Sequence, residues 1–262
     1  MWTYQHEQFV VHQLPALNDN YIYLLDNRQA GILAAIDPSD SAPVRKACLQ
    51  LGYPLTHILN THHHWDHTDG NLELQQRFNC PILGNREDSA RIPGLSQPLT
   101  AGEAFKLGSM HILTLDLPGH TLGHIAFLID DALFCGDVLF GGGCGRNFEG
   151  SLAQMLSSLQ QLAALPSDTQ VYCAHEYTLS NLRFAREVDP DNTELTARIS
   201  RDTQRRRSKQ PTIPSNIGLE CATNPYLRSL FPEFFNPYAD TYQLAAFPLD
   251  VFSDLRKRKS RC

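Results

Sequence analysis

One short segment of the chain carries a high density of side chains that can bind metal ions. Four histidines and one aspartate occupy six consecutive positions, 62 to 67, in the sequence THHHWDH. Neutral imidazoles together with a carboxylate are the ligands that borderline-soft divalent cations select. His62, His64 and Asp66 alternate along the chain, so an extended segment would point them to one side. His67 follows Asp66 directly and breaks this alternation, so a second set of ligands faces a point beside the first. The segment therefore predicts two neighbouring metal ions.

Three further metal-competent side chains each follow an apolar run or a tight turn. His120 lies in the glycine-flanked sequence PGHTLGH, Asp137 ends the run LFCGD, and His175 ends the run VYCAH. Functional side chains gather at strand ends in layered αβ folds, because a rigid element meets a loop there. Alone, each histidine would be read as a hydrogen-bonded structural residue and Asp137 as a turn residue. Beside the cluster at positions 62 to 67, all three are candidate metal ligands.

The elements that must position these side chains follow from the apolar periodicity and the turn residues. Strands are predicted at residues 21–25, 31–36, 55–60, 81–83, 105–115, 125–129, 132–135 and 171–174. Helices are predicted at residues 41–51, 151–165, 181–188, 192–209 and 249–259, and Asp69 is expected to cap a further helix that ends at residue 78.

The character of the chain changes after the last of these strands. From about residue 180 it is rich in Arg, Glu and Gln at helical spacing, and a proline-studded stretch follows from residue 211. This pattern indicates an α+β protein with a mixed domain of strands and helices over residues 1–175 and a smaller helical domain over residues 176–262.

Charge and cysteine usage narrow the class of protein. The net charge of −6 does not favour a nucleic-acid-binding surface, and no apolar run is long enough to span a bilayer. The N-terminus lacks the basic start and apolar core of a signal peptide. Seven scattered cysteines without a Cys-x-x-Cys pair suit reduced thiols in the cytoplasm. We therefore expect a cytoplasmic protein without nucleic-acid or membrane partners, and a monomer, since nothing in the sequence demands an oligomer.

Four motifs, in the order THHHWDH, PGHTLGH, CGDVLF and CAHEYT, resemble those of the metallo-β-lactamase superfamily. More narrowly, the chain is similar to the glyoxalase II, or hydroxyacylglutathione hydrolase, group over nearly its whole length. The first motif alone marks only the superfamily, and the stretch GCGRNFEG at residues 143–150 and the helical C-terminal region narrow the resemblance. The resemblance implies a four-layer αββα sandwich followed by a helical, substrate-binding C-terminal domain.

The resemblance also implies a role for each candidate ligand. It assigns seven side chains to two metal ions that share Asp137 and a hydroxide, with His62, His64 and His120 on the first ion and Asp66, His67 and His175 on the second. The ions are expected to be zinc, although such mixed ligand sets also accept iron or manganese. Of the other histidines, His63 is expected to point away and His124 to support the ligands or belong to the core.

A second set of residues is expected to bind the substrate. Glutathione carries two carboxylates, so its site should offer cations. Arg256 and Lys259 match a family Arg-x-x-Lys pattern that reaches the glycine carboxylate of glutathione, although the basic C-terminal cluster alone would be read as a solvated end. Arg146 and Tyr177 match two further family positions, and Phe148 replaces a tyrosine of some members, so its contact must be through packing or backbone.

The expected reaction follows from the charges at the two ions. Two divalent cations outweigh the negative charges of Asp66, Asp137 and a bridging hydroxide, so ionisation of the bound water is favoured near neutral pH. Asp66 and Asp137, with that hydroxide, are the expected catalytic groups. A thiol has a pKa of about 8.5 and leaves as thiolate without a strong acid. The resemblance therefore implies a thioester hydrolase acting on S-(2-hydroxyacyl)glutathione, typically S-D-lactoylglutathione, in the second step of methylglyoxal detoxification.

Three alternatives remain open on the sequence alone. A lactonase or a phosphodiesterase could use the same pair of metals. A mononuclear iron persulfide dioxygenase would share the fold, but such relatives generally lack the complete second set that Asp66, His67 and His175 supply here. A non-enzymatic scaffold would be expected to have lost ligands, and every ligand position is filled.

Overall fold

The chain forms two compact units in the computed structural model, which describes residues 1–260. The first unit comprises Met1–Asp116 and Gly123–Gly136, and the second comprises Leu117–Leu122 and Asp137–Cys262. Cys262, one of the seven scattered cysteines, lies outside the described residues. The units are defined by compactness in space, so the domain boundary after residue 175 remains a prediction.

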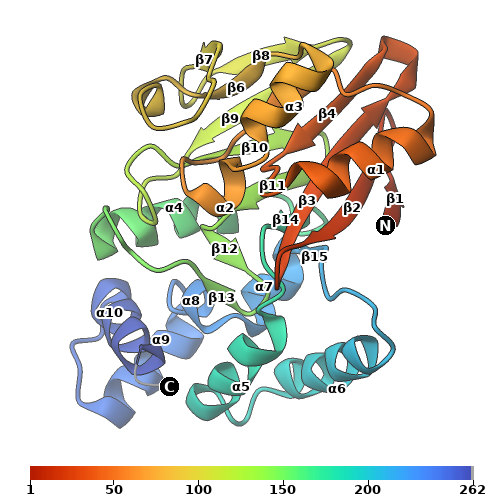
Figure 1. Cartoon of the computed structure of the whole chain (residues 1–262). Helices are drawn as coiled ribbons and strands as arrows, with labels where there is room; N and C mark the ends of the chain where they lie inside the picture. The colour runs from red at the N-terminus through yellow and green to blue at the C-terminus, as the bar shows by residue number, and fades with distance from the viewer. Residues whose placement is uncertain (261–262) are drawn as a thin grey trace. The chain divides into compact units, whose positions relative to one another are not determined.

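A seven-stranded sheet with its strands in chain order is the centre of the first unit. The first four strands pair antiparallel, and the pairs from β4 to β7 are parallel. Helices α1 and α3 cover one face of this sheet (Figure 1). The elements are β1 (Trp2–Gln5), β2 (Val10–Ala16), β3 (Asn20–Asn27), β4 (Ile32–Ile36), β5 (His57–Leu59), β6 (Ile82–Asn85), β7 (Gln97–Leu99), α1 (Ser41–Leu51), α2 (Trp65–Thr68) and α3 (Asn71–Phe78), with short 3-10 turns at Arg28–Ala30 and Arg86–Asp88.

A second, antiparallel set of strands packs on the other face of this sheet. It consists of β8 (Ala104–Leu107), β9 (Met110–Asp116), β10 (Ile125–Ile129) and β11 (Ala132–Gly136). The ring of Tyr23 on β3 meets the ring of Phe134 on β11 edge to face, with centroids 5.6 Å apart. The prediction of one strand over residues 105–115 was wrong, because Gly108 adopts a φ of 61° and turns the chain into a hairpin.

The predicted helix cap at Asp69 was also wrong. Asp69 continues the helical turn of α2 with φ −60° and ψ −28°, and its backbone N–H donates to Trp65. A capping side chain acts from an extended backbone, which this residue does not have. Gly70 precedes α3 instead, and a Cβ there would lie 2.6 Å from the Pro38 carbonyl oxygen, so the close approach requires glycine.

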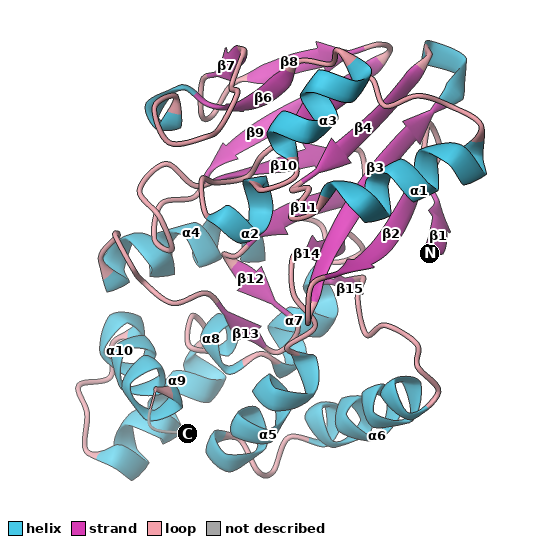
Figure 2. Cartoon of the chain, viewed as in Figure 1, coloured by secondary structure: helices cyan, strands magenta, loops and turns pink. Residues whose placement is uncertain are grey.

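The second unit is mostly helical after Ser151, with only short strands between its helices (Figure 2). The predicted helices all form, and three further helices that the sequence did not predict, α7, α8 and α9, lie between α6 and α10. No helix among residues 1–260 is long and apolar enough to cross a membrane. The elements are β12 (Leu139–Phe140), β13 (Gly143–Cys144), α4 (Leu152–Ala163), β14 (Gln170–Cys173), α5 (Thr178–Val188), α6 (Thr193–Arg207), β15 (Ser215–Asn216), α7 (Ile217–Thr223), α8 (Pro225–Arg228), α9 (Pro232–Tyr242) and α10 (Pro248–Lys259).

Candidate metal centre and substrate pocket

The histidine cluster lies between the end of β5 and the start of α2 in the first unit. His62 and His67 are fully buried, and their ring centroids are 4.0 Å apart. His62 Nε2 lies 3.0 Å from His64 Nδ1. His67 Nε2 lies 3.8 Å from an oxygen of Asp66. The local chain therefore gathers four of the seven predicted ligands around a short turn.

A buried aspartate that the sequence analysis did not single out organises this cluster. Asp37 Oδ1 accepts from the backbone N–H of Thr61 at 2.8 Å, and Oδ2 accepts from the Thr61 hydroxyl at 2.6 Å. Oδ2 also accepts from His67 Nδ1 at 3.0 Å. Since the Thr61 hydroxyl donates to Asp37, it accepts from His62 Nδ1, which lies 3.1 Å away. Asp37, directly and through Thr61, therefore favours the neutral tautomer of both imidazoles that carries its proton on Nδ1 and has its lone pair on Nε2.

These lone pairs fit a cation. A deprotonated Nε2 facing a carboxylate oxygen, as His67 faces Asp66, is unfavourable unless a positive charge lies near both. Imidazole nitrogen and carboxylate oxygen are also the donor set that divalent transition metals select. The chemistry of the cluster agrees with a metal site.

The missed aspartate had a signal in the sequence. Asp37 directly follows the apolar strand β4, the same pattern that singled out Asp137 after β11. It has a φ of 50°, a left-handed conformation that aspartate and asparagine tolerate better than most residues.

Replacing Asp37 by asparagine is expected to weaken metal binding by about 10- to 100-fold, the usual effect of losing a group that orients metal-bound histidines. Asparagine suits the left-handed backbone but has one acceptor oxygen for three donors. Zinc affinity can be measured by competition with a chromogenic chelator. Asp69→Asn, an exposed acid of the same segment, is the matched control, and equal affinities for the two variants would contradict the role of Asp37.

Two further histidines near the cluster contact other groups. His63 Nδ1 lies 3.3 Å from a carboxylate oxygen of Asp88. His124 is fully buried and stacks on His62, with centroids 4.7 Å apart and an angle of 22° between the rings. His124 therefore supports the ring of a candidate ligand.

The other three predicted ligands come together in the second unit. One oxygen of Asp137 lies 3.4 Å from His120 Nε2, and the other lies 3.4 Å from His175 Nε2. His120 Nδ1 lies 2.8 Å from the Arg146 carbonyl oxygen, which only accepts, so His120 carries its proton on Nδ1. An Nε2 lone pair then faces a carboxylate oxygen, again an arrangement that suits a cation. A carboxylate with one histidine at each oxygen is what a residue bridging two metal ions requires.

A glycine next to Asp137 allows this packing. A Cβ at Gly145 would lie 1.9 Å from the carbonyl oxygen of Asp137 and 3.2 Å from the His120 ring. No side chain fits in that space, so the glycine of the GCGR stretch is required for the wall of the site. The structure thus gathers His62, His64, Asp66 and His67 in the first unit and His120, Asp137 and His175 in the second, and the joining of the two sets remains a prediction.

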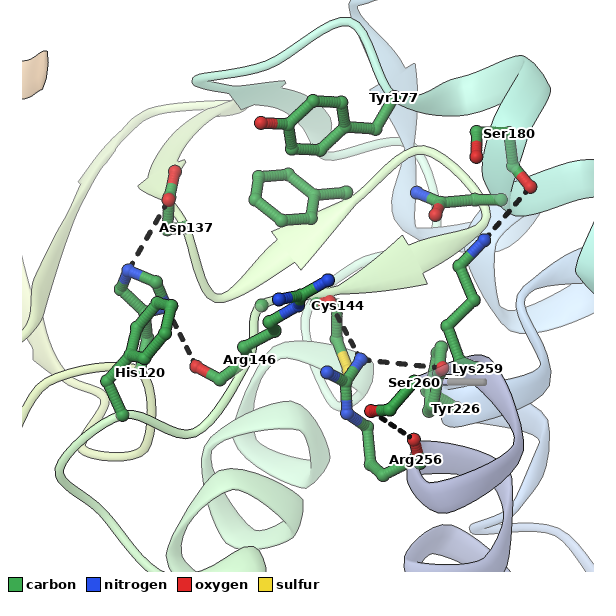
Figure 3. A pocket seen from close by; sticks show the side chains of 14 residues that line it. His120, Asp137, Cys144, Arg146, Tyr177, Ser180, Tyr226, Arg256, Lys259 and Ser260 are labelled. Atoms are coloured by element: carbon green, nitrogen blue, oxygen red, sulfur yellow. Dashed lines mark hydrogen bonds and ion pairs between the residues drawn. The ribbon is translucent and has the colours of Figure 1, made fainter. Parts of the chain in front are cut away.

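A cavity of about 370 Å³ opens beside Asp137 within the second unit (Figure 3). All five residues that the sequence analysis proposed for substrate binding line it, together with two candidate ligands: Arg146, Phe148, Tyr177, Arg256 and Lys259, with His120 and Asp137. The cavity therefore runs from the candidate metal ligands to a group of cations.

Aromatic rings form the part of the wall nearest the histidines. Tyr177 stacks on His175 with centroids 4.7 Å apart and the ring planes 3° from parallel. Phe148 meets His120 edge to face at 5.2 Å and is 64% exposed. Phe140 meets both His175 and Tyr177 edge to face, at 5.8 and 5.3 Å. The rings restrict how the imidazoles can turn.

The C-terminal cations are built into the pocket wall. The side chain of Arg256 is buried, and its Nη1 lies 3.2 Å from the Cys144 carbonyl oxygen and 3.4 Å from the Tyr226 hydroxyl (Figure 3). Lys259 Nζ donates to the Ser180 carbonyl oxygen at 3.1 Å. Both residues line the cavity, so these two positions are not the solvated basic end that composition alone suggests.

Comparisons with known proteins agree with this architecture. Residues 36–175 match the family model described as metallo-beta-lactamase superfamily, and residues 176–262 match the model described as hydroxyacylglutathione hydrolase C-terminus. A protein of Methylococcus capsulatus named hydroxyacylglutathione hydrolase is 48% identical over 250 residues, which cover 94% of this chain and 96% of the relative.

Solved structures show the same fold. The crystal structure of ETHE1 from Myxococcus xanthus covers 96% of this chain and 98% of its own, with a TM-score of 0.65 and 22% identity. The structure of TTHA1623 in a di-iron-bound form covers 83% of this chain and 99% of its own, with a TM-score of 0.59 and 25% identity. The predicted fold, mixed sheets with a helical C-terminal region, is confirmed.

Proposed function

Because the chain belongs to the hydroxyacylglutathione hydrolase family of the metallo-β-lactamase superfamily, we propose that it hydrolyses S-(2-hydroxyacyl)glutathione thioesters. The typical substrate is S-D-lactoylglutathione, and the products are D-lactate and glutathione, as in the second step of methylglyoxal detoxification. One observation carries the proposal: a single cavity joins His120 and Asp137 to the cations Arg146, Arg256 and Lys259. A glutathione thioester requires both ends of this cavity, with metal ligands near its thioester carbonyl and cations near the carboxylates of the tripeptide.

The seven candidate ligands would hold two divalent cations. We assign His62, His64 and His120 to the first, Asp66, His67 and His175 to the second, and Asp137 to both, with zinc as the first choice and iron or manganese as alternatives. The di-iron form of TTHA1623 supports a pair of metals on this fold. Bound cations of this kind supply a hydroxide near neutral pH and stabilise negative charge on a carbonyl oxygen.

The chain's own groups have three tasks in the reaction. Asp37 and Thr61 favour the tautomers of His67 and His62 with the proton on Nδ1, which offer Nε2 as the ligand atom. Asp66 and Asp137 would hold the cations as carboxylate ligands and thereby orient the nucleophile that the cations supply. Arg256 and Lys259 bind the remote carboxylate of glutathione, which fixes the thioester within the cavity.

Cys144 lines the cavity but is not expected to act as a nucleophile. Burial raises the pKa of its thiol to about 11, and nearby Arg256 offsets this only in part. Cys144→Ala should keep kcat within about threefold of the wild type, because the thiolate and not the thiol is the nucleophile. Steady-state kinetics check this, and a loss of activity that Cys144→Ser does not restore would point to covalent catalysis instead.

The test of the proposed function is a thioesterase assay on S-D-lactoylglutathione with dialysed and remetallated protein. Chelation should abolish hydrolysis, and two equivalents of zinc per chain should restore it. One iron per chain together with oxygen uptake on glutathione persulfide would contradict the proposal in favour of a dioxygenase.

We further propose that the protein acts as a cytoplasmic monomer on a small molecule, with residues 176–262 as its substrate-binding domain. The net charge of −6 and the six free cysteines of the described residues support this setting over a nucleic-acid or membrane partner. Sedimentation analysis at micromolar concentration would test the oligomeric state.

A further inference from the structure

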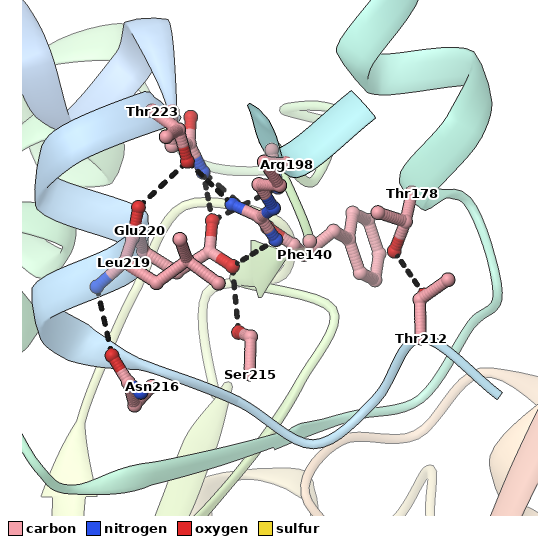
Figure 4. Close-up of polar contacts among 12 residues, drawn as sticks. Phe140, Thr178, Arg198, Thr212, Ser215, Asn216, Leu219, Glu220 and Thr223 are labelled. Carbon is pink, nitrogen blue, oxygen red and sulfur yellow. Dashed lines mark hydrogen bonds and ion pairs between the residues drawn. The ribbon is translucent and has the colours of Figure 1, made fainter. Parts of the chain in front are cut away.

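A buried ion pair in the second unit contacts the turn that builds one wall of the pocket. Arg198 on α6 is 1% exposed and Glu220 on α7 is 0% exposed, and Arg198 Nη2 lies 2.6 Å from Glu220 Oε1 (Figure 4). Desolvating two charges costs much of what their attraction contributes, so stability alone is a weak reason for such a pair. The other contacts of the pair indicate what it positions.

Two donors point at each oxygen of the Glu220 carboxylate. Oε1 accepts from Arg198 and from the Ser215 hydroxyl, both at 2.6 Å (Figure 4). Oε2 accepts from the backbone N–H of Gly142 at 2.9 Å and from Asn224 Nδ2 at 3.2 Å. The carboxylate therefore ties α6 and α7 to the turn between β12 and β13.

Side chains hold this turn in place. Asn224 Nδ2 also lies 3.3 Å from the Phe140 carbonyl oxygen and 2.9 Å from that of Gly143. Asn181 Nδ2 donates to the Gly141 carbonyl oxygen at 3.1 Å. Since β12 and β13 are two residues long, their own ladder is too short to fix the hairpin. Its position depends on Glu220 and the two asparagines.

Both strands of the β12–β13 hairpin reach the pocket. Phe140 packs edge-on against the ring of His175, with centroids 5.8 Å apart. The Cys144 carbonyl oxygen accepts from Arg256 Nη1 at 3.2 Å. A displaced hairpin would move the ring that packs on a candidate metal ligand and withdraw an acceptor that fixes the guanidinium of a candidate substrate-binding residue.

We propose that Glu220, held by Arg198, is a positioning residue that fixes the β12–β13 hairpin and thereby sets the KM for the glutathione thioester. The proposal rests on the proposed function, because it names the same substrate and the same pocket. Glu220 does not touch the cavity; it acts through Gly142, and the hairpin in turn orients Arg256.

The substitution Glu220→Gln distinguishes the contact of Glu220 with Arg198 from its contact with Gly142. Glutamine keeps the size of the side chain but offers one acceptor oxygen where four donors converge. A buried guanidinium left without a partner costs more than an unpaired amide. The glutamine oxygen will therefore turn to Arg198, and its amide nitrogen will face the N–H of Gly142. The hairpin then loses its central hydrogen bond while the arginine remains paired.

Two measurements test the proposal: hydrogen exchange of peptides covering residues 139–145, read by mass spectrometry, and steady-state kinetics on S-D-lactoylglutathione. Asp202→Asn is the matched control, because Asp202 is 1% exposed and its ion pairs are with the α6 residues Arg198 and Arg201. In Glu220→Gln, exchange over 139–145 should rise about tenfold and KM about fivefold, with kcat within about twofold. Asp202→Asn should lower the melting temperature and leave both the exchange and KM at wild-type values.

Unchanged exchange over residues 139–145 in Glu220→Gln would overturn the proposal, as would faster exchange without a rise in KM. Equal changes in Asp202→Asn would show a purely structural network and would also overturn it. Should Glu220→Gln fail to fold, Glu220→Asp keeps the charge opposite Arg198, withdraws the carboxylate from Gly142 and is carried through both measurements. A wild-type protein without thioesterase activity would contradict the proposed function, while the exchange data would still decide whether Glu220 holds the hairpin.

Discussion

Asp137→Asn is expected to lower kcat for thioester hydrolysis by roughly 10³-fold, which corresponds to several kcal/mol of transition-state stabilisation. The two oxygens of Asp137 each face a histidine Nε2 at 3.4 Å, one on His120 and one on His175. Asparagine replaces one of these oxygens by an amide nitrogen, which donates and cannot bind a cation. The variant should also hold fewer than two metal ions per chain, measured by atomic emission after dialysis.

The control for this substitution is Asp191→Asn, which makes the same chemical change at an exposed loop position. It should retain wild-type kcat and metal content. Two bound metals in Asp137→Asn, together with more than about a tenth of wild-type kcat, would show that the carboxylate does not bridge the ions.

Arg256→Ala and Lys259→Ala are each expected to raise KM for S-D-lactoylglutathione by roughly tenfold or more, with kcat changed by less than about threefold. In the proposed function both cations bind the remote end of the substrate, which is bound equally in the ground and transition states. Arg256→Ala should also lower the melting temperature, because its guanidinium lies 3.2 Å from the Cys144 carbonyl oxygen and 5.3 Å from the centre of the Tyr226 ring. Lys259→Ala should leave the melting temperature unchanged.

Arg207→Ala removes one positive charge from an exposed helix face and serves as the matched control. Its KM should equal that of the wild type. Raising the salt concentration should raise the wild-type KM and have less effect on Arg256→Ala, since screening weakens charge pairing. An unchanged KM in both Arg256→Ala and Lys259→Ala would remove the argument for a glutathione carboxylate at this end of the pocket.

Features marked by local signals could be predicted from the sequence. The bounds of α1 were predicted to the residue, because Asp40 caps its start and Gly52 ends it in a left-handed conformation. The histidine cluster stood out because its candidate ligands are neighbours along the chain, and three further candidates stood out because each follows an apolar run or a tight turn. The family resemblance then gave their assignment to two ions and the fold.

Features that depend on distant contacts could not be predicted. Asp37 is important because Thr61 and His67 fold back onto it, and a strand ending on an acid is too common a pattern to show this. The burial of Arg256 results from the packing of α10 against Tyr226 and Cys144, whereas its charge alone suggested an exposed position. Whether the cluster at residues 62–67 and the set His120, Asp137 and His175 form one metal centre depends on contacts between segments far apart in the sequence, and it remains a prediction.

Among residues 1–260, every residue that lines the cavity belongs to the second unit, whereas the histidine cluster belongs to the first. The five candidate substrate-binding residues and four of the seven candidate metal ligands therefore belong to different compact units. A directed-evolution search for activity on another thiol could be confined to the cavity-lining positions between 140 and 260. Such a library would leave positions 37 and 61 to 67 untouched, and it should also keep Phe140, Phe148 and Tyr177, whose rings pack on His120 and His175.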